Sequence, residues 1–464
     1  MNSGKANAVE RLTLIIFVIL QTIAFYFVWR TEYNPMLASS YLFKGNTLMI
    51  LIYGVVAALC YKALEAFKLI LNSAYNLAVS HIISNVFIDF IIYIILIIVF
   101  RGFTTPVPML KLLAINILIS ALWIPLCKLI FKKILRGSKS ILFYTIDDPK
   151  RLKKKLDKRK DRISVEKFVK IESVKDIKSE YLDGFECAVI AYMPSNFRNE
   201  LLKLCFEKNV EAVVFPKVSD VLMRGAKELN IYNQPMFILG NSYISPFQRF
   251  LKRAFDIVFS ALVIVVSSPI VLAVSLAIKI EDGGPVFYKQ KRCSINGKEF
   301  VIYKFRSMIV DAEKNSAAQL ASKDDKRITK VGKFIRPTRV DELPQFINII
   351  KGEMSVVGPR PERKELIEKY SKYVEAFPYR TKVKAGLTGY AQIMGKYNSN
   401  PYNKLLYDLI YIQKFSVILD LKLILMTVKI MFVKDSTEGV DEEFDEFMEC
   451  FKKTLPELSK DETD

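Results

Sequence analysis

The chain has 464 residues, of which 51% are hydrophobic and 25% are charged, and 68 Lys and Arg residues against 48 Asp and Glu residues give a formal net charge of +20. This length allows two or three domains, and this mixture is typical of a membrane protein with large soluble parts. With one histidine, His81, and six cysteines without CxxC spacing, the composition argues against histidine-based catalysis, a zinc site and a disulfide framework.

Any catalysis must then rest on carboxylates, Lys, Arg, Tyr or a hard cation such as Mg²⁺ held by oxygen ligands. The basic excess favours anionic partners, which are lipid headgroups, nucleotides or nucleic acid. Positive charge flanking membrane segments is the alternative explanation, and we expect it to account for much of the excess.

Four apolar stretches, 12–29, 47–66, 82–100 and 110–131, each approach the roughly 20 residues that a helix needs to cross a bilayer. The first lacks a cleavage site of small residues and is not read as a signal peptide. Basic residues cluster over 128–139, after the fourth stretch, which places that side of the membrane, and with it the N-terminus, in the cytoplasm. We expect a four-helix transmembrane region over 1–138.

Residues 139–245 alternate between strand and helix patterns, which predicts a parallel α/β domain. The expected buried strands are 141–145, 187–193, 211–216 and 236–240, with helices over 196–208 and 218–229. The turn after the first strand, 146–149, holds two aspartates and no glycine, which opposes pyrophosphate binding. The sequence predicts a Rossmann-like but degenerate fold that binds no dinucleotide and has a structural or regulatory role.

The apolar region 254–280 is long enough to span a membrane but is interrupted by Ser267, Ser268 and Pro269. Proline removes a helix hydrogen bond, so we expect a kink or break, and the serines offer partners for the freed carbonyl groups. The segment either dips into the membrane and returns or forms a kinked fifth span, and the pattern favours neither. A return is required if the following polar, basic region, 281–433, uses a cytoplasmic substrate.

The string from 336 to 362, RPTRVDELPQFINIIKGEMSVVGPRPE, holds an adjacent carboxylate pair, Asp341 and Glu342. Pro344 belongs to the first turn of the following apolar helix, which places both acids near a helix N-terminus whose dipole keeps them ionised. Helix neighbours point about 100° apart, so one acid is expected to act as nucleophile and the other to hold a metal. The alternative is a helix cap with a glutamate that matches the dipole.

Cationic residues surround this pair in the sequence. They are Lys304, Arg306, Arg327, Lys330, Arg336, Arg339 and Arg360. Phosphoryl transfer needs positive charge on the phosphate oxygens beside a positioned nucleophile, and arginine suits bidentate phosphate contacts. Surface solvation or lipid headgroup binding explains any one of these arginines alone, but it explains the group less well.

Residues 250–433 resemble the bacterial sugar transferase family, the monotopic polyprenyl-phosphate phosphoglycosyl transferases. The matching pieces are KRAFDIVFSA, the hairpin broken at Ser-Pro, GGPVFYKQKR, FVIYKFRSM, DELPQFINIIKGEMSVVGPRP, GLTGYAQIMGK and YDLIYIQKFSVILDLKLIL, in this order. The whole layout is similar to the long, polytopic subgroup that starts capsule, O-antigen or exopolysaccharide repeat units. The implied fold class is α/β with membrane helices, in which a catalytic domain, 246–435, carries a re-entrant helix, 254–280, broken at Ser268 and Pro269, before an acidic tail, 436–464.

The resemblance implies that Asp341 attacks the sugar-bearing phosphorus of a UDP-sugar, that UMP leaves, and that undecaprenyl phosphate then takes the sugar phosphate from the enzyme. It implies that Glu342, together with Asp341, binds Mg²⁺. The expected substrate-binding residues are Arg336, Arg360, Lys304, Arg306, Gln290 and Arg292. Asp408, in LLYDLIYI, is expected to support the metal side of the site.

The resemblance also implies a bacterial inner-membrane protein with a cytoplasmic catalytic domain, membrane lipids as partners and a homodimer. The stretch 415–432 is either an interfacial helix or a buried core helix. Departures from the family pattern, at Ala385, Cys293 and Pro337, remove no charge that the mechanism needs. The sugar stays open between glucose, galactose and an N-acetylated sugar. The alternative function is an inactive scaffold for polysaccharide assembly, and no nucleic-acid-binding module is present in the sequence.

Overall fold

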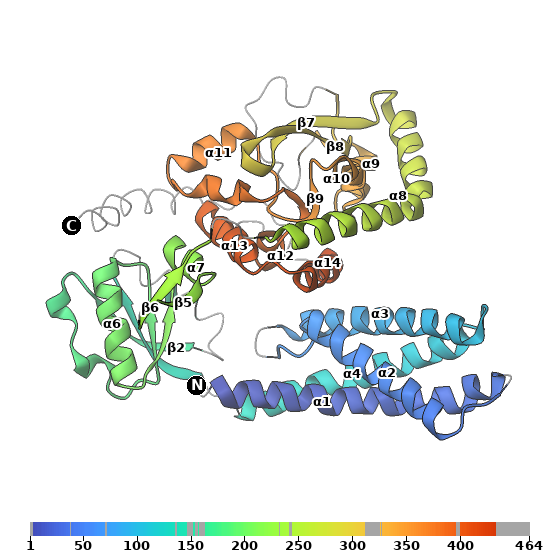
Figure 1. Ribbon diagram of the computed structural model, residues 1–464, viewed down its shortest axis with the longest axis horizontal. Coiled ribbons are helices and arrows are strands. Elements are labelled where there is room, and N and C mark those ends of the chain that lie inside the picture. Colours follow the sequence, from blue (N-terminus) through green and yellow to red (C-terminus); the bar gives the residue numbers. More distant parts are fainter. Residues whose placement is uncertain are drawn as a thin grey trace. The chain divides into compact units, whose positions relative to one another are not determined.

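The computed structural model describes residues 3–37, 39–69, 72–134, 137–145, 152–153, 156, 163–231, 233–240, 244–310, 325, 327–395 and 400–432. The chain divides into two compact units, 1–215 and 216–464, and Figure 1 shows the elements of each. The turn 146–149 and the acidic tail, 436–464, lie outside the described residues.

Four long helices open the first unit, as the apolar stretches predict. They are α1 (Ser3–Val28), α2 (Phe43–Ala63), α3 (Ala74–Phe100) and α4 (Val107–Ile134), and each contains a segment long and apolar enough to cross a membrane. Phe17, Phe25, Tyr53 and Tyr61 are fully buried between them. Many other apolar side chains of these helices, such as Leu122, face outward, as expected for a bundle whose solvent is lipid.

A parallel sheet follows, which confirms the predicted α/β domain. Its strands are β1 (Ser138–Tyr144), β2 (Ile163–Lys170), β3 (Cys187–Ile190) and β4 (Glu211–Val214), in the order β2-β1-β3-β4, with α6 (Ser195–Glu207) between β3 and β4. Strand β2 is absent from the sequence prediction, because its sequence, ISVEKFVK, has neither a continuous apolar run nor strict apolar–polar alternation.

The prediction that 236–240 is a buried strand of this sheet is wrong. Strand β6 (Gln234–Ile238) is exposed along its length and pairs antiparallel with β5 (Lys227–Ile231) in the second unit. Asn233, with φ 62°, lies in the two-residue turn between them, and such a turn produces a hairpin rather than a crossover. The predicted helix over 218–229 is the shorter α7 (Val218–Met223).

Helix α8 (Pro246–Asp282) contains Pro269, and Figure 1 shows two arms that meet at a bend. Pro269 has no N–H group for the carbonyl four residues earlier, that of Val265. The Ser268 hydroxyl donates to this carbonyl instead, with a distance of 2.8 Å from Oγ to O. The interruption predicted at Ser268 and Pro269 is therefore present, and a side chain satisfies the carbonyl group that it frees.

The rest of the second unit packs around a large apolar core that includes Ile349, Phe377, Leu405 and Leu423, beside a smaller cluster that includes Ile278. Its strands are β7 (Phe287–Cys293), β8 (Glu299–Phe305), β9 (Ser355–Val357) and β10 (Gly386–Thr388). Its helices after α8 are α9 (Lys330–Ile335), α10 (Gln345–Lys351), α11 (Lys364–Ser371), α12 (Tyr390–Met394), α13 (Pro401–Gln413) and α14 (Val417–Met431).

Helix α14 combines features of both alternatives that the sequence left open for 415–432. Leu423 and Met426 are buried in the domain, whereas Ile418 is 82% exposed and Leu421 is 50% exposed. One face of the helix is thus part of the core and the other presents apolar side chains outward.

Candidate active site

The carboxylate pair lies where the chain enters α10. A single 3₁₀ turn, Val340–Glu342, carries Asp341 and Glu342, and Pro344 is the cap residue that precedes α10. Arg339, directly before the turn, has φ 54°, a left-handed conformation that changes the chain direction. Glu342 points into the domain and is only 9% exposed, whereas Asp341 is half-buried.

Three cationic side chains converge on Glu342. Lys304 Nζ lies 3.1 Å and Arg360 Nη2 lies 3.3 Å from Oε1, and Arg339 Nη1 lies 3.6 Å from Oε2. Burial alone would raise the pKa of the Glu342 carboxyl, but these three charges outweigh it and hold the pKa well below its usual range. Glu342 is therefore an ionised, firmly held carboxylate.

Asp341 differs from Glu342 both in its ion pairs and in the direction of its pKa shift. Within the described part of the chain, it makes no hydrogen bond or ion pair. Burial, and after it the charge of Glu342, raises the pKa of Asp341 to about 6, against the opposing effects of Lys304, Arg336 and Arg360. Burial therefore leaves Asp341 much closer to protonation at neutral pH than Glu342.

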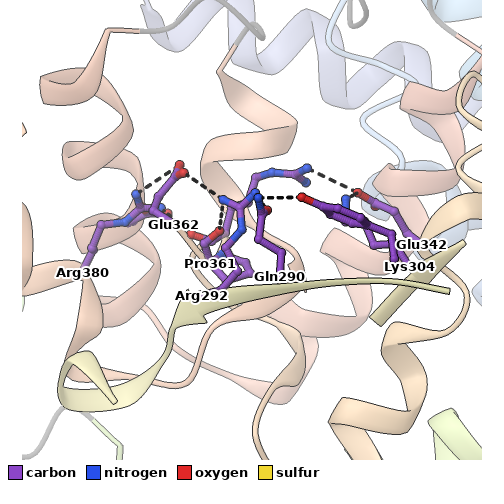
Figure 2. A network of polar contacts seen from close by, with 10 residues as sticks. Gln290, Arg292, Lys304, Glu342, Pro361, Glu362 and Arg380 are labelled. Carbon is purple, nitrogen blue, oxygen red and sulfur yellow. Dashed lines mark hydrogen bonds and ion pairs between the residues drawn. The ribbon is translucent and has the colours of Figure 1, made fainter. Parts of the chain in front are cut away.

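A row of polar contacts extends across the domain from Asp341 and Glu342, which are called the carboxylate dyad from here on. Figure 2 shows it running from Glu342 and Lys304 past Gln290 and Arg292 to Glu362. Arg292 Nη2 donates to Gln290 Oε1 at 2.6 Å, and Arg292 Nη1 lies 3.7 Å from Glu362 Oε2. Gln290 and Arg292 thus lie beside the loop that carries Arg360, and substrate contact by either stays a prediction.

The loop Gly358–Pro359–Arg360 is fixed by close backbone packing. Gly358 N donates to Thr388 O and Gly386 N donates to Pro359 O, both at 2.8 Å. A Cβ atom on Gly386 would lie 2.0 Å from Gly358 N, so only glycine fits at this position. The loop therefore presents Arg360 from a rigid backbone.

Arg380 supports the same loop and is absent from the sequence prediction. It is 3% exposed, and its Nη2 atom donates to the Arg360 carbonyl oxygen at 3.0 Å. The same nitrogen lies 2.8 Å from Asp408 Oδ2, and Nη1 lies 3.6 Å from Glu362 Oε1. In the sequence, Arg380 lies in a basic run, PYRTKVK, that looks like ordinary surface, so no local signal marks it.

Three other predicted residues have different surroundings. Asp408 is 1% exposed and pairs with Arg380; burial raises its pKa to about 6 although Arg380 lowers it. Arg306 Nη1 donates to Asp282 Oδ2 at 2.7 Å and so binds the end of α8. Arg336, at the end of α9, lies within electrostatic range of Asp341. Their expected substrate or metal roles stay predictions.

The donor set around the dyad is compatible with Mg²⁺. This ion is usually held by one or two carboxylates together with substrate phosphates and water, and Asp341 and Glu342 supply two carboxylates. Glu342 Oε2, whose closest cation is Arg339 at 3.6 Å, is the less committed of the Glu342 oxygens. Among the described residues, no cluster of three or more acidic, histidine or cysteine side chains forms a metal cage.

Residues 247–434 match the family described as bacterial sugar transferase. A UDP-N-acetylgalactosamine-undecaprenyl-phosphate N-acetylgalactosaminephosphotransferase of Aeromonas hydrophila is 39% identical over 194 residues, which cover 41% of this chain and 46% of that protein. A UDP-glucose:undecaprenyl-phosphate glucose-1-phosphate transferase of Klebsiella pneumoniae is 40% identical over 222 residues, 47% of each protein. The chain thus spans about half the length of these relatives.

A shorter relative is matched almost completely. The uncharacterized sugar transferase EpsL of Bacillus subtilis is 38% identical over 188 residues, which cover 40% of this chain and 90% of that protein. The region matched by the family model, 247–434, holds the carboxylate dyad, nearly all of α8 and the Arg360 loop.

Proposed function

Because the chain belongs to the bacterial sugar transferase family, we propose that it transfers a sugar 1-phosphate from a UDP-sugar to undecaprenyl phosphate and thereby starts the synthesis of a polysaccharide. The names of the relatives differ in the sugar, which is N-acetylgalactosamine in one and glucose in another. We leave the sugar open between glucose, galactose and an N-acetylated sugar.

One observation carries the proposal, namely the different surroundings of the two adjacent acids. Glu342 is buried, ionised and held by Lys304, Arg339 and Arg360. Asp341 has no ion pair among the described residues, and its pKa of about 6 leaves it ionised at neutral pH. A carboxylate that is free of partners and next to concentrated positive charge is suited to attack phosphorus.

In the proposed first step, an Asp341 oxygen forms a bond to the phosphorus that bears the sugar. The bond from this phosphorus to the bridging oxygen breaks, and UMP leaves with that oxygen and its electron pair. In the second step, a phosphate oxygen of undecaprenyl phosphate attacks the same phosphorus. The Asp341–phosphorus bond breaks, which regenerates the carboxylate and gives undecaprenyl diphospho-sugar.

The cations around Glu342 serve the same chemistry. Lys304 and Arg360 share one carboxylate oxygen, so together they keep positive charge in excess beside Asp341. This excess stabilises negative charge on the phosphoryl oxygens during transfer. We propose that Asp341 and Glu342 also hold Mg²⁺, which supplies further charge neutralisation of the diphosphate when bound.

The packing of α8 supports a re-entrant segment. Near its start, the Asp256 carboxylate accepts from Ser355 Oγ and Val356 N, both at 3.0 Å. Near its end, Ile278 packs with Phe305 and Ile335 of the same domain. A straight helix would separate Asp256 and Ile278 by roughly 33 Å, which exceeds the hydrocarbon thickness of about 30 Å.

Both ends of α8 therefore contact one domain that cannot lie on two sides of a membrane. The side chains around the bend are apolar and exposed, for example Val265 and Val266 at 71% and Leu272 at 63%. We propose that this tip enters one leaflet and returns, which places Asp341 at the headgroup level where the phosphate of the lipid acceptor lies. As part of the same proposal, the catalytic domain is cytoplasmic and the protein is a homodimer.

The proposal is tested by UMP release. The full-length protein in detergent is incubated with a panel of UDP-sugars, undecaprenyl phosphate and Mg²⁺, and the wild type is compared with Asp341→Asn. Release by the wild type that the variant has lost supports the proposal and identifies the sugar. If folded wild-type protein releases no UMP from any sugar, the chain is an inactive scaffold of polysaccharide assembly, which is the alternative function.

A further inference from the structure

The four-helix bundle of the first unit contains a file of polar side chains that the transfer reaction does not use. His81, Asn85 and Asp89 recur every four residues on one face of α3, and they are 0%, 0% and 7% exposed. Polar and ionisable groups at membrane depth are costly unless they are paired, so a buried file of this kind calls for partners or a ligand.

Around His81 and Asn85, the buried polar side chains form hydrogen bonds with one another. Gln21 Nε2 of α1 donates to Asn85 Oδ1 at 3.2 Å, and the Tyr61 hydroxyl of α2 donates to the same oxygen. His81 Nδ1 lies 3.3 Å from Ser120 Oγ of α4, to which Asn85 Nδ2 also donates. All four helices thus contribute to a closed hydrogen-bond network at this level.

One turn further along α3, buried acceptor oxygens lack hydrogen-bond donors from the residues that the structure describes. Asp89 is the next residue in the file, and neither of its carboxylate oxygens has a hydrogen-bond partner among the described residues. Asn116, one turn before Ser120 on the antiparallel α4, also has a buried side-chain oxygen without a partner. The amide nitrogen of Asn116 donates to the Tyr53 hydroxyl at 2.9 Å, and this hydroxyl is within electrostatic range of Asp89.

This level therefore has an excess of acceptors. Asp89 supplies two unpartnered oxygens and Asn116 supplies one, and the Tyr53 hydroxyl accepts from the Asn116 amide. No lysine or arginine pairs with Asp89 in the described part of the chain. Asp89 lies 15 residues from the first residue of α3, Ala74, and 11 from the last, Phe100, so it is near the middle of the span and far from interfacial counter-charges.

From these observations we propose that the bundle holds a monovalent cation, either a proton or a sodium ion, between Asp89 and Asn116. A single carboxylate balances a single positive charge, which disfavours a divalent ion, and acceptor oxygens without a cationic side chain disfavour an anion or a lipid phosphate. A proton on Asp89 would be donated to the Asn116 oxygen. Sodium would be ligated by the Asp89, Asn116 and Tyr53 oxygens.

The site is tested in the full-length protein reconstituted in lipid nanodiscs at pH 8, where Asp341 and Asp408, each with a pKa of about 6, are ionised. The melting temperature, Tm, is measured in sodium chloride and in choline chloride at equal ionic strength. If sodium occupies the site, Tm rises by several degrees with sodium in the wild type but not in Asp89→Asn. The asparagine supplies its own donor for Asn116, so this variant is expected to fold without a cation.

If a proton occupies the site, sodium has no effect on Tm. The infrared difference spectrum between wild type and Asp89→Asn then shows the carbonyl stretch of a protonated carboxylic acid. Glu32→Gln is the matched control, because Glu32 pairs with Lys111 at the exposed end of the bundle, and it should leave both signals unchanged. A wild type with neither a sodium response nor a protonated carboxyl signal would overturn the proposal. The readouts do not involve UMP release, so this result is independent of the proposed transfer activity.

Discussion

Lys304 and Glu342 form an ion pair with 3.1 Å between Nζ and Oε1, and this pair joins strand β8 to the turn that carries the dyad. It fixes Glu342 at the site and leaves the neighbouring Asp341 without an ion pair among the described residues. The proposed division between a nucleophile and a charge-organising carboxylate therefore depends on Lys304 as much as on the acids themselves.

Replacing Lys304 by Met should lower kcat for UMP release by about 100-fold or more, because it removes one of the charges that stabilise the transferring phosphoryl group. Lys291→Met is the matched control, since Lys291 lies on the neighbouring strand β7, is exposed and has its nearest acid, Glu299, 4.0 Å away. Equal rates for the two variants would show that Lys304 has no special role.

The pH dependence of UMP release should show an acid limb that reports Asp341. Its pKa of about 6 without bound Mg²⁺ means that, at subsaturating Mg²⁺, the nucleophile gains a proton as pH falls through 6, so kcat/KM should decrease by about tenfold per pH unit below that value. Glu342 stays ionised over this range because its pKa is well below its usual value. A flat profile down to pH 5, in protein that stays folded, would contradict the assignment.

Arg380→Met should lower the stability of the protein as well as its activity. Asp408 is 1% exposed, and loss of Arg380 leaves it buried without its partner, which costs about 3–5 kcal/mol in comparable cases. The double variant Arg380→Met/Asp408→Leu should recover much of the Tm but not kcat, because the Arg360 carbonyl still lacks its donor. Recovery of both would show that Arg380 has a purely structural role.

The re-entrant topology predicts that Lys298, an exposed residue after α8, lies on the cytoplasmic side. A Lys298→Cys variant in a Cys450→Ser background should react with a membrane-impermeant thiol reagent only after the cells are lysed. The five other cysteines are buried, and the labelling of the Cys450→Ser protein without the new cysteine gives their contribution to the signal. Labelling in intact cells would show that α8 is a kinked fifth span instead.

Local signals were sufficient for much of the fold. The four apolar helices and the bend in α8 were predictable because hydrophobic length and a proline at 269 act within one segment. The sequence predicts 236–240 as a strand of the parallel sheet, whereas β6 pairs with β5, because an apolar run predicts a strand but does not identify its partner. The turn residues, 232 and 233, are not the Asn-Gly or Asp-Gly pair that marks a hairpin in a sequence.

The candidate site shows the same contrast between local patterns, which the sequence reveals, and contacts between distant parts of the chain, which it does not. Asp341 and Glu342 were found because they are adjacent and precede a helix start, which is a local pattern. Arg380 was missed because its partners, Asp408 and the Arg360 carbonyl, come from distant parts of the chain and meet only in the folded domain. Arg306 fits both a phosphate ligand and the helix anchor that its contact with Asp282 describes, and the sequence cannot separate these roles.

The most direct test of the proposed mechanism is the intact mass of the full-length protein after incubation with its UDP-sugar and Mg²⁺ in the absence of undecaprenyl phosphate. The two-step mechanism predicts a gain of one sugar phosphate that maps to Asp341, is absent in Asp341→Asn and disappears when undecaprenyl phosphate is added. Rapid UMP release that requires undecaprenyl phosphate, with no mass gain at any time, would show direct transfer and contradict a covalent role for Asp341.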